Sequence, residues 1–509
     1  MNFRPVLNVA LAMIIAVLLS CKLFTSQASR IITSLTLAVS LIVVIFLNYK
    51  CKKKFLKILI PILIAMIIPF ISIIIKTNKI NQNHRLNVEK CEIYGKIYKI
   101  NENLDNSRVD IYLTNVELRA GEDKIDFYGN YLLRVNSNNF DISKLKQGYY
   151  IECVTTPKLY SLDSGDSFDL SYISRDIMGM SYSYSYAVQI SDRFVPSLRD
   201  KITSKVYSCF EKTDLFFTSV GYAMLFGDTT VIEDSVYSVF ENSGTLHLLA
   251  VSGFHVSVIA MCLTFILKKL KANKVVGFIV TAVVMILYAY LCNYSVSIVR
   301  AIIMSLLAMY AGLRNKECDR LSSLFSAAIF IMLLNPLDLF NISFVLSFIS
   351  VLSILLLMPV FSRFFSKFMH DKLANAFSLN LSISLGISVY ELYYFGKAPI
   401  LSFVSNIITV PIVSILFIFL IFSLLIGSLF GIAVPLIEVF GVGIKYILQF
   451  NNWIAGIGLS ILAQNVREIT LALTILFMYV LSDYLFVQKK NKAMIVGLLA
   501  GIILSLLIF

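Results

Sequence analysis

The stretch FLKILIPILIAMIIPFISIII, residues 55–75, contains a single charged side chain, Lys57. A helix needs about 20 mainly apolar residues to cross the hydrocarbon core of a bilayer, so this stretch predicts a transmembrane helix. Similar blocks recur along the 509-residue chain, of which 58% is hydrophobic and only 15% charged, with a mean hydropathy of +0.80. A soluble domain has about 25% charged residues. We therefore expect a polytopic α-helical membrane protein with about 11–13 spans.

The apolar blocks form two groups. Two blocks precede residues 55–75, near residues 6–24 and 31–48. The first, Val6–Leu19, resembles a secretory signal, but no small-residue cleavage site follows it, so we interpret it as a span. The second group is expected near residues 246–267, 275–292, 295–312, 321–334, 341–359, 374–393, 400–430, 434–461, 469–487 and 493–509. The region 400–461 has room for a re-entrant segment.

Lysines between the second and third blocks, from Lys50 to Lys57, indicate the orientation. Short loops rich in Lys and Arg stay in the cytoplasm. The N-terminus is therefore expected in the cytoplasm, and residues 76–212 outside the cytoplasmic membrane. Later basic loops at 268–274, 314–320, 363–372 and 489–492 then fall on the cytoplasmic side. This rule explains most of the formal net charge of +13; a funnel that attracts polyanions is the alternative interpretation.

The segment after residue 75 changes character. Alternating runs at 92–97, 109–113, 131–135 and 149–154, separated by Asn, Asp and Gly, predict half-buried strands. We expect a small extracytoplasmic β domain, OB-like, inserted between the two membrane segments. The predicted domains are a three-span segment at 1–75, the β domain at 76–195, amphipathic helices at 196–245 and a multi-span channel domain at 246–509. Residues 76–215 carry 19 basic and 19 acidic side chains, so this region is no basic patch.

Several kinds of site are not expected. The chain has four histidines, eight scattered cysteines and no CxxC pair, HExxH run or HxHxDH run, so we predict neither a metal centre nor a cofactor. It has no GxxxxGK[ST] loop, so we do not expect it to hydrolyse nucleotides. Cys91 and Cys153 both fall in the outer domain, where the location permits a disulfide and the spacing does not decide its geometry.

One stretch, GTLHLLAVSGFHV from Gly244 to Val256, places two histidines eight residues apart. Such positions lie on roughly one face of a helix. His247, Ser252 and His255, with Gly253 allowing a close approach, are therefore predicted to line a path or to clamp a neighbouring helix. Both interpretations remain open, and two histidines without a nearby carboxylate make an incomplete metal set.

Arg300 lies within an expected span. An arginine near the centre of a span costs about 2.5–3.5 kcal/mol on insertion scales, so its side chain must face protein or water. Its candidate partners are Asp228, Glu241, Asp338 and Glu391. The alternative is a side chain that extends to the membrane interface.

The order of these motifs resembles that of the ComEC family of competence proteins. Five blocks over about residues 222–411 carry the resemblance, with Phe254 standing where the family often has Leu. They are Leu225–Asp228; Gly244–Val256; Tyr288 through Ser295 to Arg300-Ala301; Asn335-Pro336 followed by Phe344–Phe348, which includes Ser347; and Tyr394–Gly396 with Asn406 through Pro411.

The resemblance implies transport of single-stranded DNA across the cytoplasmic membrane during natural transformation. It implies an extracellular DNA receptor, a cytoplasmic helicase-like ATPase and a separate nuclease as partners, within the lipid bilayer and with a homo-oligomer as one option. Many members continue into a metallo-β-lactamase-like domain whose metal motif is absent here, so we do not expect an enzyme. The alternatives are a solute or lipid-intermediate transporter and a hydrolase using His247, Ser252 and His255, which lacks a nearby acid.

Overall fold

The computed structural model forms two compact units, Met1–Ser204 with Phe325–Asn341, and Lys205–Leu324 with Ile342–Phe509. The residues that the structure describes are 5–23, 29–40, 54–84, 90–103, 108–120, 123–136, 145, 147–162, 167–184, 188–213, 215–229, 232–462, 466–484 and 489–508.

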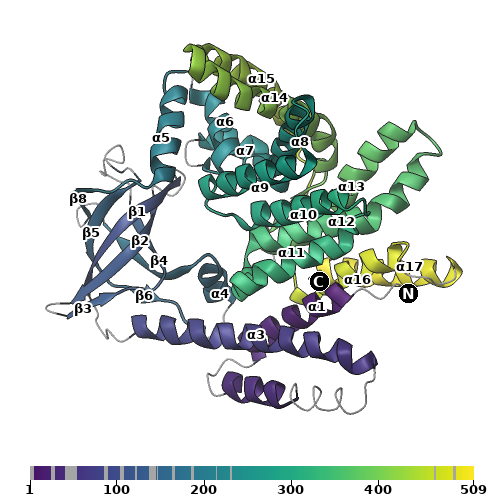
Figure 1. Cartoon of the computed structure of the whole chain (residues 1–509), viewed down its shortest axis with the longest axis horizontal. Coiled ribbons are helices and arrows are strands. Elements are labelled where there is room, and N and C mark those ends of the chain that lie inside the picture. Colours follow the sequence, from purple (N-terminus) through teal and green to yellow (C-terminus); the bar gives the residue numbers. More distant parts are fainter. Residues whose placement is uncertain are drawn as a thin grey trace. The chain divides into compact units, whose positions relative to one another are not determined.

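The first unit combines membrane helices with a sheet. Helix α1 (Pro5–Leu18) continues into the π-helical turn η1 (Leu19–Leu23) and packs on α3 (Lys54–Asn83), the long helix that contains the block at 55–75. The strands are β1 (Cys91–Asn103), β2 (Arg108–Ala120), β3 (Asp123–Asp126), β4 (Asn130–Asn136), β5 (Tyr149–Thr155), β6 (Lys158–Leu159), β7 (Ile177–Ser183) and β8 (Val188–Phe194). Helix α4 (Ser167–Ser174) precedes β7, α5 (Leu198–Phe210) follows β8, and η7 (Pro336–Phe340) follows α11 (Arg320–Leu334) (Figure 1).

The four runs predicted as strands are strands β1, β2, β4 and β5. The sheet has the order β6-β7-β4-β2-β1-β5-β8, with β3 on β2. All pairs are antiparallel except β4 and β7, which are parallel. Thr155 of β5 donates to the carbonyl of Tyr182 in β7 at 2.8 Å, so the sheet curves until these two strands meet.

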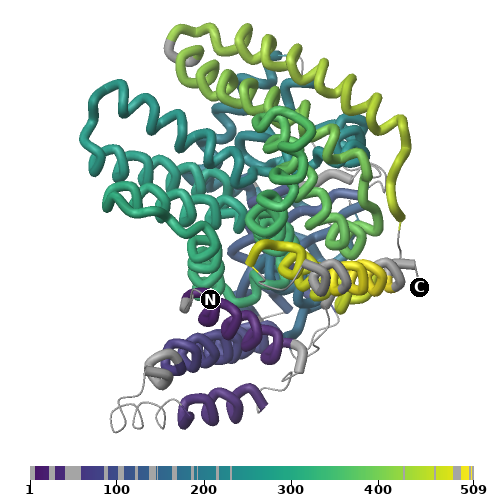
Figure 2. Tube along the Cα trace, turned by 90° about the vertical axis from the view of Figure 1, so that its right-hand side faces the viewer, coloured from purple at the N-terminus to yellow at the C-terminus, as the bar shows by residue number. Residues whose placement is uncertain are grey.

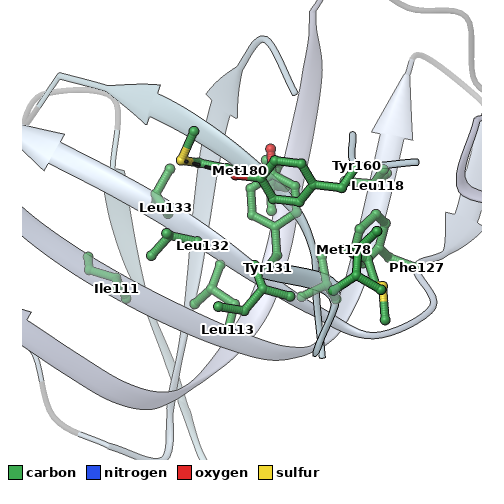
Figure 3. Packing of buried hydrophobic residues seen from close by; sticks show 14 of the residues in the cluster. Ile111, Leu113, Leu118, Phe127, Tyr131, Leu132, Leu133, Tyr160, Met178 and Met180 are labelled. Atoms are coloured by element: carbon green, nitrogen blue, oxygen red, sulfur yellow. Dashed lines mark hydrogen bonds between the residues drawn. The ribbon is translucent and has the colours of Figure 1, made fainter. Parts of the chain in front are cut away.

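The interior of the sheet is apolar, as alternation predicts. In β2 every second residue from Val109 to Leu113 is buried, and the pattern slips at Asn115, whose φ of 52° marks the irregular register opposite β1. Figure 3 shows Tyr131 packed among buried neighbours that include Leu133 and Met180. The sheet is joined to α3 by a reciprocal pair in which Asn83 donates to the carbonyl of Tyr128 at 3.0 Å and accepts from its N–H at 2.9 Å.

Arg30, which is completely buried, joins three segments of this unit. Its guanidinium donates to the Ser20 carbonyl (3.0 Å), the Thr77 hydroxyl (3.0 Å) and the Leu162 carbonyl (2.9 Å). The five donors of a guanidinium suit this role, because one planar group can satisfy acceptors in several directions. The contact ties η1, α3 and the segment after β6 together.

The second unit is helical. Its elements are α6 (Leu215–Phe226), α7 (Asp234–Asn242), η6 (Leu246–Leu248), α8 (Gly253–Lys269), α9 (Lys274–Leu291), α10 (Val296–Leu313), α12 (Ile342–Phe365), α13 (Asp371–Phe395), α14 (Ser402–Phe430), α15 (Ala433–Gly456), α16 (Glu468–Leu481) and α17 (Lys489–Ile508), with a short β9 (Lys397–Pro399) and β10 (Ser460–Leu462) hairpin-like pair. Figure 2 follows α14 and α15 side by side. Helices α12 and α13 approach closely at Gly386 of α13. A β-carbon at this position would lie only 2.5 Å from Cβ of Ser353 in α12, so the close approach requires glycine.

Seven described helices are long and apolar enough to cross a membrane: Leu59–Asn83, Lys274–Leu291, Val296–Leu313, Ile342–Phe365, Asp371–Phe395, Ser402–Gly427 and Ala433–Gly456. They match seven of the predicted spans, so the polytopic helical fold with an inserted β domain is confirmed. Shorter apolar helices lie at Val6–Cys21, Arg320–Leu334 and Glu468–Leu481. Part of the predicted span at 31–48 lies outside the described residues. The region 400–461 forms two full-length helices, α14 and α15, that turn at Gly431.

Replacing Arg30 tests the three-way contact. Arg30→Ala leaves two buried carbonyls without this donor, so we expect a loss of about 3 kcal/mol or more of stability, since bonds to charged groups are worth about 1.5–3 kcal/mol each. Arg30→Lys keeps the charge but not the planar guanidinium, so its stability should lie between those of the wild type and Arg30→Ala. Thermal unfolding in detergent measures the order; equal melting of Arg30→Ala and wild type would contradict it.

Candidate functional site

The start of helix α8 is built by Ser252 and His255. Ser252 is the N-cap residue, with extended backbone, and its N–H donates to Nδ1 of His255 at 3.1 Å. His255 is three residues into the helix, so the two residues form a reciprocal cap. Because Nδ1 accepts, a neutral ring carries its proton on Nε2. That nitrogen is buried without a hydrogen-bond partner, and the ring packs edge-on against Phe417 at 4.5 Å.

Arg300 of α10 lies directly against this helix start. A β-carbon on Gly253 would be 2.7 Å from Nη2 of Arg300, so the glycine makes room for the guanidinium. Arg300 is 7% exposed, its Nε has no hydrogen-bond partner, and its guanidinium lies 5.9 Å from the Phe348 ring centre. The side chain is therefore enclosed by helices α8, α10 and α12.

No acidic residue within the described part of the chain forms an ion pair with Arg300. Of the four predicted partners, Glu241 pairs with Lys397 at 3.1 Å, and Asp338 accepts from Asn335 in the other unit. The N-terminus of a helix carries about half a positive charge, so Arg300 adds a like charge to it. The arrangement is a buried positive site that an anion would stabilise.

The histidines do not share a helix face, contrary to the prediction. His247 lies in the 3₁₀ turn η6, and α8 begins afresh at Gly253, so the eight-residue spacing spans a break. His247 is exposed, whereas His255 is fully buried. Of the two histidines, only His255 lies in α8, the helix whose first residue contacts Arg300.

Gly244 fixes the conformation of the segment before α8. This segment precedes the cluster formed by Ser252, Gly253, His255 and Arg300. Its φ of +73° is a left-handed conformation, and a β-carbon there would lie 2.4 Å from Cβ of Ser402 at the start of α14. The next residue, Thr245, accepts from Asn451 of α15 at 3.1 Å, and Asn451 accepts from Thr409 of α14 at 2.9 Å. Sequence reasoning missed this buried relay, because single polar residues in apolar helices gave no periodic signal.

The remaining predicted residues have different surroundings. Asp228 is buried and follows the left-handed Gly227. In α14, Asn406 is buried with an unpartnered Oδ1, and Pro411 lies within the same helix. Ser347 of α12 has a buried hydroxyl without a partner.

Asn335 and Pro336 belong to the first unit. Asn335 caps η7 by accepting from the N–H of Leu337 and donates to Asp338 at 2.8 Å, while Lys76 Nζ lies 3.4 Å from its Oδ1. Burial raises the pKa of Asp338 to about 6, although Lys76 and Asn335 oppose the shift.

The disulfide that the location of Cys91 and Cys153 permits is not formed: both are free thiols. Cys91 pairs with Thr155 and Cys153 with Ile93, so the cysteines are diagonal neighbours on β1 and β5. Diagonal positions are about 7–8 Å apart, which is beyond ordinary disulfide geometry. Among the described residues, no group of three His, Cys, Asp or Glu side chains could hold a metal ion.

Residues 224–490, which include the cluster, match the family model described as "Competence protein". This match covers more than half of the chain. The chain belongs to the ComEC family of competence proteins. The family resemblance drawn from the motif order is thereby confirmed, and the residues of the α8 and α10 cluster all lie inside the matched region.

Two relatives are similar to this family member. ComE operon protein 3 of Bacillus subtilis (strain 168) is 27% identical over 215 residues, which are 42% of the chain and 26% of the relative. Recombination protein 2 of Haemophilus influenzae is 25% identical over 260 residues, 48% of the chain and 32% of the relative. The matched parts thus span about a quarter to a third of these curated relatives. No solved structure matches the chain.

Gly244→Ala tests the packing of the motif. The substitution forces an alanine into a left-handed conformation and into the Ser402 backbone, so we expect a loss of about 2–4 kcal/mol. Gly277→Ala is the matched control, because a β-carbon there has nothing within 4 Å; it should change stability by at most about 1 kcal/mol. Thermal unfolding in detergent compares them, and equal effects would contradict the close contact.

Asp338→Asn tests the raised pKa. A carboxyl whose folded pKa, about 6, exceeds its ordinary value of 3.8 favours folding when protonated, so its contribution is lost as pH rises from about 4 through 6. Asn keeps an acceptor for Asn335 without the charge. We expect the variant to be the more stable one at pH 7.5, by about 1–2 kcal/mol, and the two proteins to converge near pH 4. A constant difference across that range would contradict this assignment.

Proposed function

We propose that this chain carries single-stranded DNA across the cytoplasmic membrane during natural transformation. The observation that supports it best is the buried guanidinium of Arg300, which lies against the start of α8 without an acidic partner among the described residues. A polyanion crossing a bilayer must be kept from lipid and its phosphates met by cations or N–H donors. Membership of the competence family gives this positive site its context.

The proposed orientation has the N-terminus in the cytoplasm and residues 76–212 outside. The basic loops support it. The outer sheet is proposed to be OB-type: β1 pairs with both β2 and β5, β4 is antiparallel to β2, and β4 is parallel to β7. These pairings support the proposal of a partly open Greek-key barrel, a fold that often binds single strands.

Only some tyrosines of this domain suit base stacking. Tyr131 is fully buried and Tyr150 nearly so, whereas Tyr182 and Tyr184 are 63% and 64% exposed. Arg134 donates to the hydroxyl of Tyr182 at 3.0 Å, which places a cation beside an exposed ring. These two exposed tyrosines are the proposed contacts for bases.

In this proposal the chain provides passage and no chemistry. A DNA receptor outside, a helicase-like ATPase inside and a separate nuclease are the proposed partners, and self-association is a further option. Because the sequence has no nucleotide-binding loop, the proposed source of energy is this ATPase or another gradient.

Uptake by Arg300 variants tests the function. A deletion strain expressing Arg300→Gln should bind labelled DNA normally but internalise about 10-fold less, since a lost charged contact costs about 1.5–3 kcal/mol. Arg300→Lys should retain part of the uptake. Gly253→Ala displaces the guanidinium and should resemble Arg300→Gln, with Gly277→Ala as the matched control.

The levels of each variant in the membrane must be equal for the comparison. Normal internalisation by Arg300→Gln would remove the site from the path. If Arg300→Gln reduced the uptake of a labelled small solute and left the uptake of DNA unchanged, the result would favour the transporter alternative.

A further inference from the structure

An open pocket of about 550 Å³ runs along helix α3 in the first unit. Residues of α3 spaced three and four apart form one side: Ile68, Ile71, Ser72, Ile75, Lys76 and Lys79. Such positions share one face of a helix. From Ile68 to Lys79 the helix rises about 16 Å, which is about half of a bilayer's hydrocarbon core. The residues of α3 that line the pocket therefore extend over a length similar to the thickness of one leaflet.

The groove changes from apolar to charged along its length. At one end, Ile71 is 46% exposed and Ile75 is 52% exposed on a helix that is apolar enough to cross the membrane. At the other end the lining is Lys76, Lys79, Tyr128 and Asp176. An occupant that satisfies both ends has an apolar chain and a polar group attached to it.

At the charged end, one of the two lysines, Lys79, has no carboxylate partner among the described residues. Lys76 pairs with Asp176 at 3.5 Å and lies 3.4 Å from Asn335 Oδ1. Lys79 lies 5.3 Å from the Tyr128 ring centre. Tyr128 is held in place by the reciprocal bonds of Asn83 to its backbone. The ammonium group of Lys79 therefore lies beside the fixed ring of Tyr128, at the end of the apolar part of the groove.

We propose that this groove binds one glycerophospholipid of the surrounding bilayer. An acyl chain lies along Ile68, Ile71 and Ile75, and the phosphate is held by Lys79, with Lys76 and Asn335 behind it. A phospholipid fits better than a water-soluble ligand, because the apolar part of the groove lies on a helix that is long and apolar enough to cross the membrane. The site is distinct from the positive cluster at α8 and does not depend on DNA transport.

Retention of lipid by the purified full-length chain tests the proposal. After extensive washing in detergent, native mass spectrometry should detect one glycerophospholipid per chain. Ser72→Trp fills the groove and Lys79→Gln removes the phosphate partner; each should lower retention by about five-fold or more, as expected for about 1 kcal/mol.

Two control variants carry the same kinds of substitution at positions outside the groove. Ile279→Trp adds an indole at an exposed site on α9, and Lys99→Gln removes a lysine that lies over Tyr112 at 5.8 Å. Both should retain lipid like the wild type. Should Ser72→Trp unfold, Lys79→Gln alone decides the result.

Competition separates a lipid from a free phosphate. Inorganic phosphate at millimolar concentration should not displace the bound lipid, because it cannot occupy the apolar part of the groove. Full displacement by phosphate, or equal retention by Lys79→Gln and Lys99→Gln, would overturn the proposal.

Discussion

Polar groups among apolar helices must find their hydrogen bonds inside the protein, because lipid offers none. Several polar side chains of the second unit meet this constraint through local bonds. Ser353 donates to the carbonyl of Ile349, and Thr474 to that of Thr470, one turn earlier in each helix. Thr245, Thr409 and Asn451 satisfy one another across three segments. Other buried polar atoms of this unit have no partner, among them the hydroxyl of Ser347 and Oδ1 of Asn406, and Arg300 and His255 each keep a buried nitrogen without one.

The family motif around α8 therefore combines two kinds of residue. Gly244, Ser252 and Gly253 shape the backbone and allow close contacts, and their roles are accounted for by packing and capping. Arg300 is not accounted for in that way, and His255, which completes the cap through Nδ1, keeps Nε2 buried without a partner. A buried charge without an opposite charge costs free energy, and such a cost is common where a protein has a ligand to bind. The motif sets the close packing at the start of α8, and the buried guanidinium of Arg300 from α10 lies against it without an acidic partner among the described residues.

The sequence predicted elements well and their partners poorly. The block at 55–75 and the alternation in β2 follow from local composition, so they were visible without a structure. The break at Ser252-Gly253 was also local, but the helical spacing of His247 and His255 concealed it. Contacts such as Arg30 with Leu162, or the register that separates Cys91 from Cys153, depend on residues far apart in the chain. No single-sequence pattern encodes those distances.

The reciprocal bonds between Asn83 and Tyr128 have a mechanical consequence. They bind the last turn of α3 to the outer sheet at both a donor and an acceptor, so the sheet cannot pivot about that helix end without breaking them. Arg30 adds a second attachment on the same helix, at Thr77. Because α3 is attached at two points, the sheet and the helix should move as one rigid part. A force applied to the sheet would then tilt α3 within the bilayer.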